Sequence, residues 1–145
     1  MSSFPHIYTT TAEGSSDDYL TLSAEGLPSM LVSSPPEFGG PKGYWNPEAF
    51  FSAAISTCFI LTYKFVAKKM KLAWNNILVD VDAYLDNTER KLSFTKAKIF
   101  VTLVVAEGVE EETAIKALHK AKETCLITNS ITSEIDLEAK ITIDR

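Results

Sequence analysis

One long uncharged run restricts most strongly how this chain of 145 residues can fold. No charged residue occurs from Ala49 to Tyr63, and the run follows Asn46-Pro47, a helix N-cap residue and a proline suited to the first helical position. These signals predict one helix from Pro47 to about Lys69 or Lys71. Because that helix is apolar nearly all round, it requires burial on most faces. A chain this short covers such a helix with difficulty, so we expect a partner subunit to supply part of the cover.

The same run is the candidate for a membrane span, and it fits that purpose poorly. It is shorter than the roughly 18 to 20 apolar residues that cross a bilayer, and it contains Ser52, Ser56 and Thr57. A buried core helix explains it better. We therefore expect no membrane partner.

The overall composition argues against a nucleic-acid partner. The formal net charge is -5, and the two arginines, Arg90 and Arg145, belong to no basic stripe. Phosphate binding needs clustered lysine and arginine, which this chain lacks. The hydrophobic fraction of 46% is ordinary for a globular protein, and the length predicts a single domain over residues 1–145.

Short strands surround the predicted helix. Alternating and β-branched segments predict six strands, at 7–12, 19–24, 29–33, 77–85, 92–105 and 135–143. The Pro/Gly-dense segment 35–44 is a loop, Asp86–Lys91 joins a hairpin, and Glu110–Cys125 is a second helix. The order βββ-α-ββ-α-β predicts an α+β fold with mostly antiparallel sheets and a long buried central helix.

Two cysteines are the candidates for chemistry. Cys58 lies in the middle of the first helix and Cys125 at the end of the second, so only the fold can bring them together. Neither position gives a thiolate help from a helix N-terminus, so ionisation needs a nearby cation or hydrogen-bond donor. Free cysteine is also among the most buried residue types, which keeps two structural thiols as the alternative. With no secretory signal recognised in the sequence, two cysteines indicate a reducing cytoplasm, where a disulfide is transient.

Glu48 is the acidic candidate, in the first turn of the helix that carries Cys58. The intervening residues span roughly 15 Å of helix rise, so Glu48 cannot touch Cys58 of its own helix. If both serve one site, a third residue bridges them or the acid comes from a neighbouring subunit. An acid in this place also stabilises the helix dipole, which is a sufficient structural explanation.

Metal and cofactor sites are not indicated. His6 and His119 stand alone, with no partner at metal-ligand spacing. Gly39-Gly40 has no phosphate-loop pattern around it. We therefore expect neither a metal nor a bound cofactor.

Several short blocks occur in one combination: Pro35-Pro36-Glu37-Phe38-Gly39-Gly40, Asn46-Pro47-Glu48, Ala53-Ala54 and Cys58-Phe59. Together with a second cysteine late in a following helix, they resemble the OsmC/Ohr family of organic hydroperoxide reductases and osmotically induced proteins. The resemblance covers almost the whole chain. It implies an OsmC-like fold and an intertwined homodimer with active sites at the subunit interface.

The resemblance implies a cytoplasmic antioxidant peroxidase whose catalytic residues are Cys58, Cys125 and Glu48. The Cys58 thiolate would attack the distal oxygen of an organic hydroperoxide, releasing an alcohol and leaving a sulfenic acid. Cys125 would resolve that acid as a disulfide, and an external dithiol such as dihydrolipoamide would reduce the disulfide. Glu48 would orient the cation that lowers the pKa of Cys58.

The sequence departs from the family at two positions. The family's catalytic arginine lies in an N-terminal glycine-rich turn, where this chain has Gly14–Asp18, and no arginine or lysine occurs before Lys42. Lys42 is a candidate replacement, although lysine lacks the rigid fork of arginine, and Asp17 and Asp18 oppose thiolate formation if they face the site. The family's usual Cys-Pro is Cys125-Leu126 here.

These departures keep an alternative function open. An OsmC-fold protein without efficient peroxidase activity would bind an apolar small molecule, or would act on another thiol-reactive substrate. The candidate contacts for an apolar ligand are Phe38, Phe50, Phe51 and Phe59. Such aromatics are also typical of a core. Both cysteines favour the peroxidase, whereas the missing arginine favours the alternative.

Overall fold

The structure is a computed structural model that describes residues 3–17 and 19–145, and the chain divides into two units between Phe50 and Phe51. The expectation about Asp18 falls outside the described residues. The single-domain organisation over residues 1–145 stays a prediction. Each unit is described by itself.

The first unit contains three short antiparallel strands in the order β1-β2-β3. They are β1 (Thr11–Glu13), β2 (Leu20–Ser23) and β3 (Met30–Val32). The three predicted strands are confirmed, but the first begins at Thr11 rather than residue 7. In the Pro/Gly-dense segment the chain forms a loop with one 3-10 turn, η1 (Pro36–Phe38). Few large apolar side chains are buried in this unit; Val32 is the clearest example.

The long helix α1 (Pro47–Met70) starts where its sequence signals place it. The Ala49 N–H donates to Asn46 Oδ1 at 2.8 Å, which confirms the N-cap. The Trp45 and Phe50 rings stack with their centroids 5.6 Å apart, as a hydrophobic staple does. The helix ends before Lys71, whose φ of 53° is left-handed. Local sequence therefore sets both ends of α1.

The second unit is built on a three-stranded sheet in the order β4-β5-β6. Its strands are β4 (Trp74–Thr88), β5 (Lys91–Ala106) and β6 (Glu134–Asp144). The turn between β4 and β5 is only Glu89-Arg90, with φ values of 52° and 65°, so the predicted six-residue connection is wrong. Two positive φ values match the twist of a tight hairpin, which lets both strands run further.

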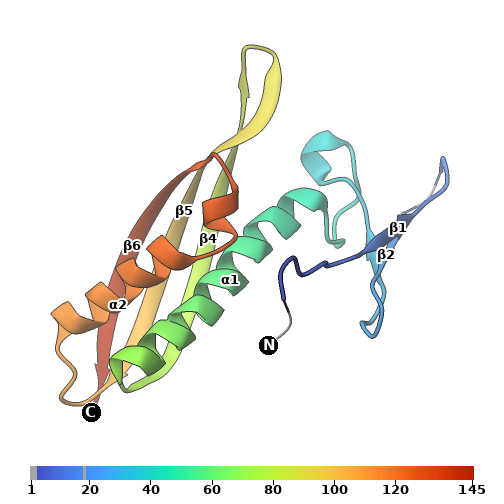
Figure 1. Ribbon diagram of the computed structural model, residues 1–145. Helices are drawn as coiled ribbons and strands as arrows, with labels where there is room; N and C mark the ends of the chain where they lie inside the picture. The colour runs from blue at the N-terminus through green and yellow to red at the C-terminus, as the bar shows by residue number, and fades with distance from the viewer. Residues whose placement is uncertain (1–2, 18) are drawn as a thin grey trace. The chain divides into compact units, whose positions relative to one another are not determined.

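The helix α2 (Glu111–Thr124) and the following 3-10 turn η2 (Thr128–Ser130) connect β5 to β6, which pair in parallel. Both helices lie against the same face of the sheet (Figure 1). Alternate residues of β5 form the centre of the core with one face of each helix. The buried side chains are Ala97, Ile99, Val101, Leu103 and Val105 of β5, Ile55, Phe59, Tyr63, Val66 and Ala67 of α1, and Ala114, Ala117, Leu118 and Ala121 of α2.

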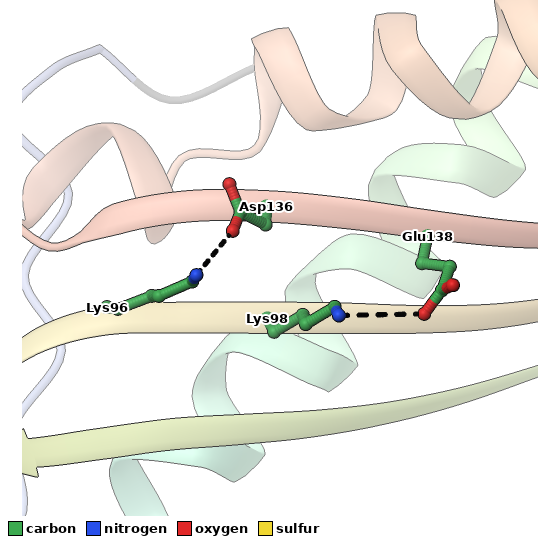
Figure 2. A network of polar contacts seen from close by, with 4 residues as sticks. All are labelled: Lys96, Lys98, Asp136 and Glu138. Carbon is green, nitrogen blue, oxygen red and sulfur yellow. Dashed lines mark ion pairs between the residues drawn. The ribbon is translucent and has the colours of Figure 1, made fainter.

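The opposite face of the sheet is polar. Lys96 contacts Asp136 at 2.9 Å and Lys98 contacts Glu138 at 3.7 Å, so two ion pairs join β5 to β6 (Figure 2). The pairs are diagonal, because Lys98 is directly opposite Asp136 in the strand register. Exposed pairs of this kind contribute little to stability. They mark the solvated side of the sheet, away from the helices.

Length and composition alone would allow α1 to cross a membrane, since an 18-residue window has a mean hydropathy of 1.5. Core helices of soluble proteins share this length and composition, so the two properties indicate a span only weakly. Of the 18-residue window, 22% is buried inside the folded chain. One face of α1 is therefore covered by the sheet and α2, while Leu61 and Phe65 on another face are 66% and 61% exposed.

Candidate functional site

A pocket of about 640 Å³ lies on the open face of α1, entirely within the second unit. Its walls come from α1 and from the segment around the end of α2. The lining residues are Ala54, Thr57, Cys58, Leu61, Thr62, Phe65, Thr124, Leu126 and Ile127. No charged side chain is among these described lining residues, and three threonines supply the hydroxyl groups. The site is an apolar hollow with one thiol in its wall.

The structure brings the two cysteines together. Cys58 is half-buried on α1, and Cys125 is fully buried directly after α2. The backbone at Cys125 is extended, with φ -65° and ψ 115°, so the chain turns out of the helix there. Both are free thiols, and each shifts the pKa of the other, so the two side chains are close enough to interact. The roles of the two thiols in one catalytic cycle stay a prediction.

The pKa of the Cys58 thiol lies below its ordinary value. Burial raises this pKa, but hydrogen bonds to the sulfur outweigh that effect. The donors are the Ile127 N–H, the Cys125 thiol, the Thr62 hydroxyl and the Leu126 N–H. The Thr62 oxygen lies 3.8 Å from the Cys58 sulfur. A thiolate at Cys58 therefore has its charge stabilised without a lysine or arginine in the pocket wall.

The pKa of Cys125 is shifted in the opposite direction. Burial raises it, hydrogen bonds from the Thr128 N–H and hydroxyl offset part of that effect, and the neighbouring Cys58 raises it further. The first proton to leave the pair is thus assigned to Cys58, with Cys125 retaining its own. One thiol is arranged as the nucleophile and the other as its protonated neighbour.

Hydrogen bonds around residues 125–130 hold the backbone donors in place. The Cys125 carbonyl accepts from the Asn129 N–H at 3.0 Å and from the Thr128 hydroxyl at 3.2 Å. The Ser130 hydroxyl donates to the Leu126 carbonyl at 2.7 Å. These bonds fix the turn that carries the N–H groups of residues 126 and 127.

Glu48 and Lys42 belong to the first unit. Glu48 lies in the first turn of α1, and its Oε2 atom is buried with no hydrogen-bond partner among residues 3–17 and 19–145. Lys42 lies exposed in the loop before α1. A buried carboxyl oxygen without a hydrogen-bond partner destabilises the fold, so we expect a donor or cation to contact Glu48. The roles of Glu48 and Lys42 toward Cys58 stay predictions.

The aromatic residues proposed for an apolar ligand occupy other places. Phe59 is fully buried in the core, and Phe51 stacks on Phe94 with ring centroids 4.1 Å apart. Phe38 is 54% exposed in the first unit. The aromatic ring in the wall of the described pocket is that of Phe65. Sequence reasoning missed this residue, although its spacing from Cys58 and Leu61 marks a shared helix face.

Comparisons with known proteins identify the family. The sequence model of the family described as OsmC-like protein matches residues 39–140. An uncharacterised protein of Acinetobacter baylyi is 27% identical over 144 residues, covering 95% of each chain. The organic hydroperoxide resistance protein-like 2 of Staphylococcus epidermidis is 27% identical over 140 residues, covering 94% of this chain and 96% of that protein.

Solved structures agree on the fold. An OsmC-like protein of unknown function from Vibrio cholerae superposes with a TM-score of 0.85 at 21% identity, covering 94% of this chain and all of the other. The α+β fold predicted from the sequence is confirmed. Because the family model spans most of the chain and the same architecture recurs, this chain belongs to the OsmC-like protein family.

Proposed function

We propose that this protein is a thiol-dependent peroxidase that reduces organic hydroperoxides to alcohols. The observation that carries the proposal is that Cys58 lines the apolar pocket and interacts with the buried Cys125 behind it, with the pKa of Cys58 lowered and that of Cys125 raised. A two-cysteine peroxidase needs one ionised thiol open to its substrate and a second thiol within reach. The Staphylococcus relative's name, organic hydroperoxide resistance protein-like 2, supports this reading.

The proposed reaction begins at the Cys58 thiolate. Its sulfur attacks the distal oxygen of the hydroperoxide, so an S–O bond forms, the O–O bond breaks and the alkoxide takes a proton to leave as an alcohol. Cys58 is left as a sulfenic acid. The Cys125 sulfur then attacks it, forming the Cys58–Cys125 disulfide as the hydroxyl group leaves with a proton as water. An external dithiol, such as dihydrolipoamide, donates two hydrogens to restore both thiols.

A homodimer is part of the proposal. The open face of α1 exposes Leu61 and Phe65, and large apolar side chains of the first unit such as Leu27 and Leu31 are also exposed. Large apolar side chains that stay exposed on each unit are typical of a subunit interface. In such a dimer, Glu48 with its unpaired buried oxygen orients a cation toward a thiol. A reducing cytoplasm suits the dithiol cycle.

The pocket also supports a second candidate function. Its walls carry no charged side chain among the described residues, and its volume of about 640 Å³ suits a small apolar molecule. In this reading the protein binds such a ligand, or acts on another thiol-reactive compound, without efficient peroxide reduction. Reaction with a peroxide separates the two candidates.

The test is a thiol count before and after one equivalent of cumene hydroperoxide. Wild type is expected to lose two thiols rapidly as the disulfide forms. Cys125→Ser is expected to stop at a sulfenic acid, which dimedone traps on Cys58 and mass spectrometry detects. Cys58→Ser is the matched control and should consume no peroxide. Slow thiol loss in folded wild type, no faster than for free cysteine, would reject the peroxidase and favour the binding protein.

A further inference from the structure

The charge of the Cys58 thiolate requires stabilisation, and the pocket wall offers no charged side chain for it among the described residues. Among the described residues, the titratable group that shifts the pKa of Cys58 is Cys125. The remaining donors come from two places. One is Thr62, a single helical turn after Cys58 on α1, and the other is the backbone of the turn that follows α2.

We propose that the N–H groups of Leu126 and Ile127, with the Thr62 hydroxyl, form a thiolate cradle that stabilises the Cys58 anion from within one chain, whether or not the dimer also supplies a cation. Residues 126 and 127 and Thr62 all line the same pocket as the Cys58 sulfur. Within the part of the chain that the structure describes, neither N–H donates to a backbone carbonyl. Both N–H groups are therefore without a backbone acceptor beside the wall that holds Cys58.

The turn is held by bonds that leave these two N–H groups unused. The carbonyl of Cys125 accepts from Asn129, and the carbonyl of Leu126 accepts from Ser130. The turn therefore keeps its shape without help from the Leu126 or Ile127 side chains. Preorganised N–H groups stabilise a charge more effectively than groups that must reorient when the charge forms.

The cradle also explains why Cys58 is the thiol that ionises and Cys125 the thiol that follows it in the reaction. Its donors follow Cys125 directly in the sequence, so the segment that stabilises the Cys58 anion also delivers the second cysteine to it. The consequence for peroxide reduction rests on the proposed function. The stabilisation of the thiolate does not, and it is measurable without any peroxide.

Leu126→Pro is the decisive variant because proline has no backbone N–H. The residue before a proline must be extended, and Cys125 already has φ -65° and ψ 115°. Leu126→Ala is the matched control, since it shortens the side chain and keeps the N–H. Thr62→Val removes the hydroxyl and keeps the shape of the side chain. All three are made in the Cys125→Ser background, so that a single thiol is followed.

The measurement is the rate of iodoacetamide alkylation of Cys58 against pH, with circular dichroism as the check on folding. At pH 7 Leu126→Pro is expected to slow alkylation about tenfold and to move the pH profile upward, as loss of one hydrogen bond to a charged group implies. Thr62→Val is expected to slow it about threefold, because the contact is long. Leu126→Ala should stay within about twofold of the background.

An unchanged pH profile in folded Leu126→Pro would overturn the cradle. If Leu126→Pro does not fold, Thr62→Val decides: an upward shift supports the cradle and an unchanged profile overturns it. The expected shifts without peroxide consumption by wild type would keep the cradle and reject the peroxidase. Rapid peroxide consumption with unshifted profiles would keep the peroxidase and reject the cradle.

Discussion

Both faces of α1 are uncharged from Ala49 to Tyr63, but the fold buries them to different extents. Phe59 and Tyr63 on one face are fully buried against the sheet and α2, whereas Leu61 and Phe65 on the other remain mostly exposed beside Cys58. Burial of the first face is a property of the single chain. The second face stays open in the single chain, and an exposed apolar face of this kind is typical of a binding surface.

The largest expected difference between the faces is in stability. Phe59→Ala should lower the free energy of unfolding by about 3–5 kcal/mol, because it opens a cavity in the core. Phe65→Ala should lower the free energy of unfolding by less. Its loss should act through subunit association and grow as protein concentration rises, because association stabilises wild type more than the variant. Urea unfolding at two protein concentrations measures both. Equal, concentration-independent losses would contradict the comparison.

A smaller difference is expected between the thiols. At pH 7, iodoacetamide should label Cys58 faster than Cys125 by on the order of tenfold, since rate follows thiolate fraction and access. The pKa of Cys58 is lowered by hydrogen bonds that outweigh its burial, and that of buried Cys125 is raised. Lowering the pH from 9 to 7 should therefore slow Cys125 more than Cys58. Peptide mapping by mass spectrometry gives both alkylation rates. Parallel dependence of the two rates on pH would contradict the predicted difference between the thiols.

The smallest effect is expected at Tyr63, on the buried face. Its hydroxyl has no hydrogen-bond partner among the described residues, and burial raises its pKa to about 12. Tyr63→Phe should raise the free energy of unfolding by up to about 1 kcal/mol at pH 7, because an unpaired buried hydroxyl is removed.

The pH dependence gives this prediction its sign. The folded-state pKa of Tyr63 lies above the ordinary value of 10.0. Its contribution to stability is therefore complete below pH 10 and is lost as the pH rises through about 12. Tyr63→Phe should lack that alkaline loss, so its advantage should grow at pH 11. Urea unfolding at both pH values is the measurement, and an identical pH dependence in the two proteins would argue against a buried hydroxyl.

Local sequence signals predicted the elements of the fold well where a side chain carried the information. Asn46 capped α1 as expected, and the ring of Trp45 packed on that of Phe50. The hairpin turn was predicted too long, because Glu89-Arg90 adopts positive φ without a glycine or asparagine to signal it. Side-chain pattern is informative about turns only when the turn requires a particular residue.

The candidate site was predictable only in part. Cys58 and Cys125 stand out in the sequence, and Thr62, Leu61 and Phe65 follow from the helical spacing around Cys58. The backbone donors of residues 126 and 127 have no sequence signal, since almost every residue type carries an N–H. The one informative feature is the absence of a proline. Leu126 stands where the resemblance expects a proline, which has no backbone N–H to donate in a hydrogen bond.

The sequence by itself determined the start and end of α1, the order of the elements and the presence of two thiols. Those properties depend on capping, periodicity and residue chemistry, which act over a few neighbouring positions. Only the tertiary structure decided that Cys58 is the more acidic thiol. That choice depends on the burial of each sulfur and on N–H groups from a turn far along the chain, and both exist only once α1 and α2 are packed on the sheet.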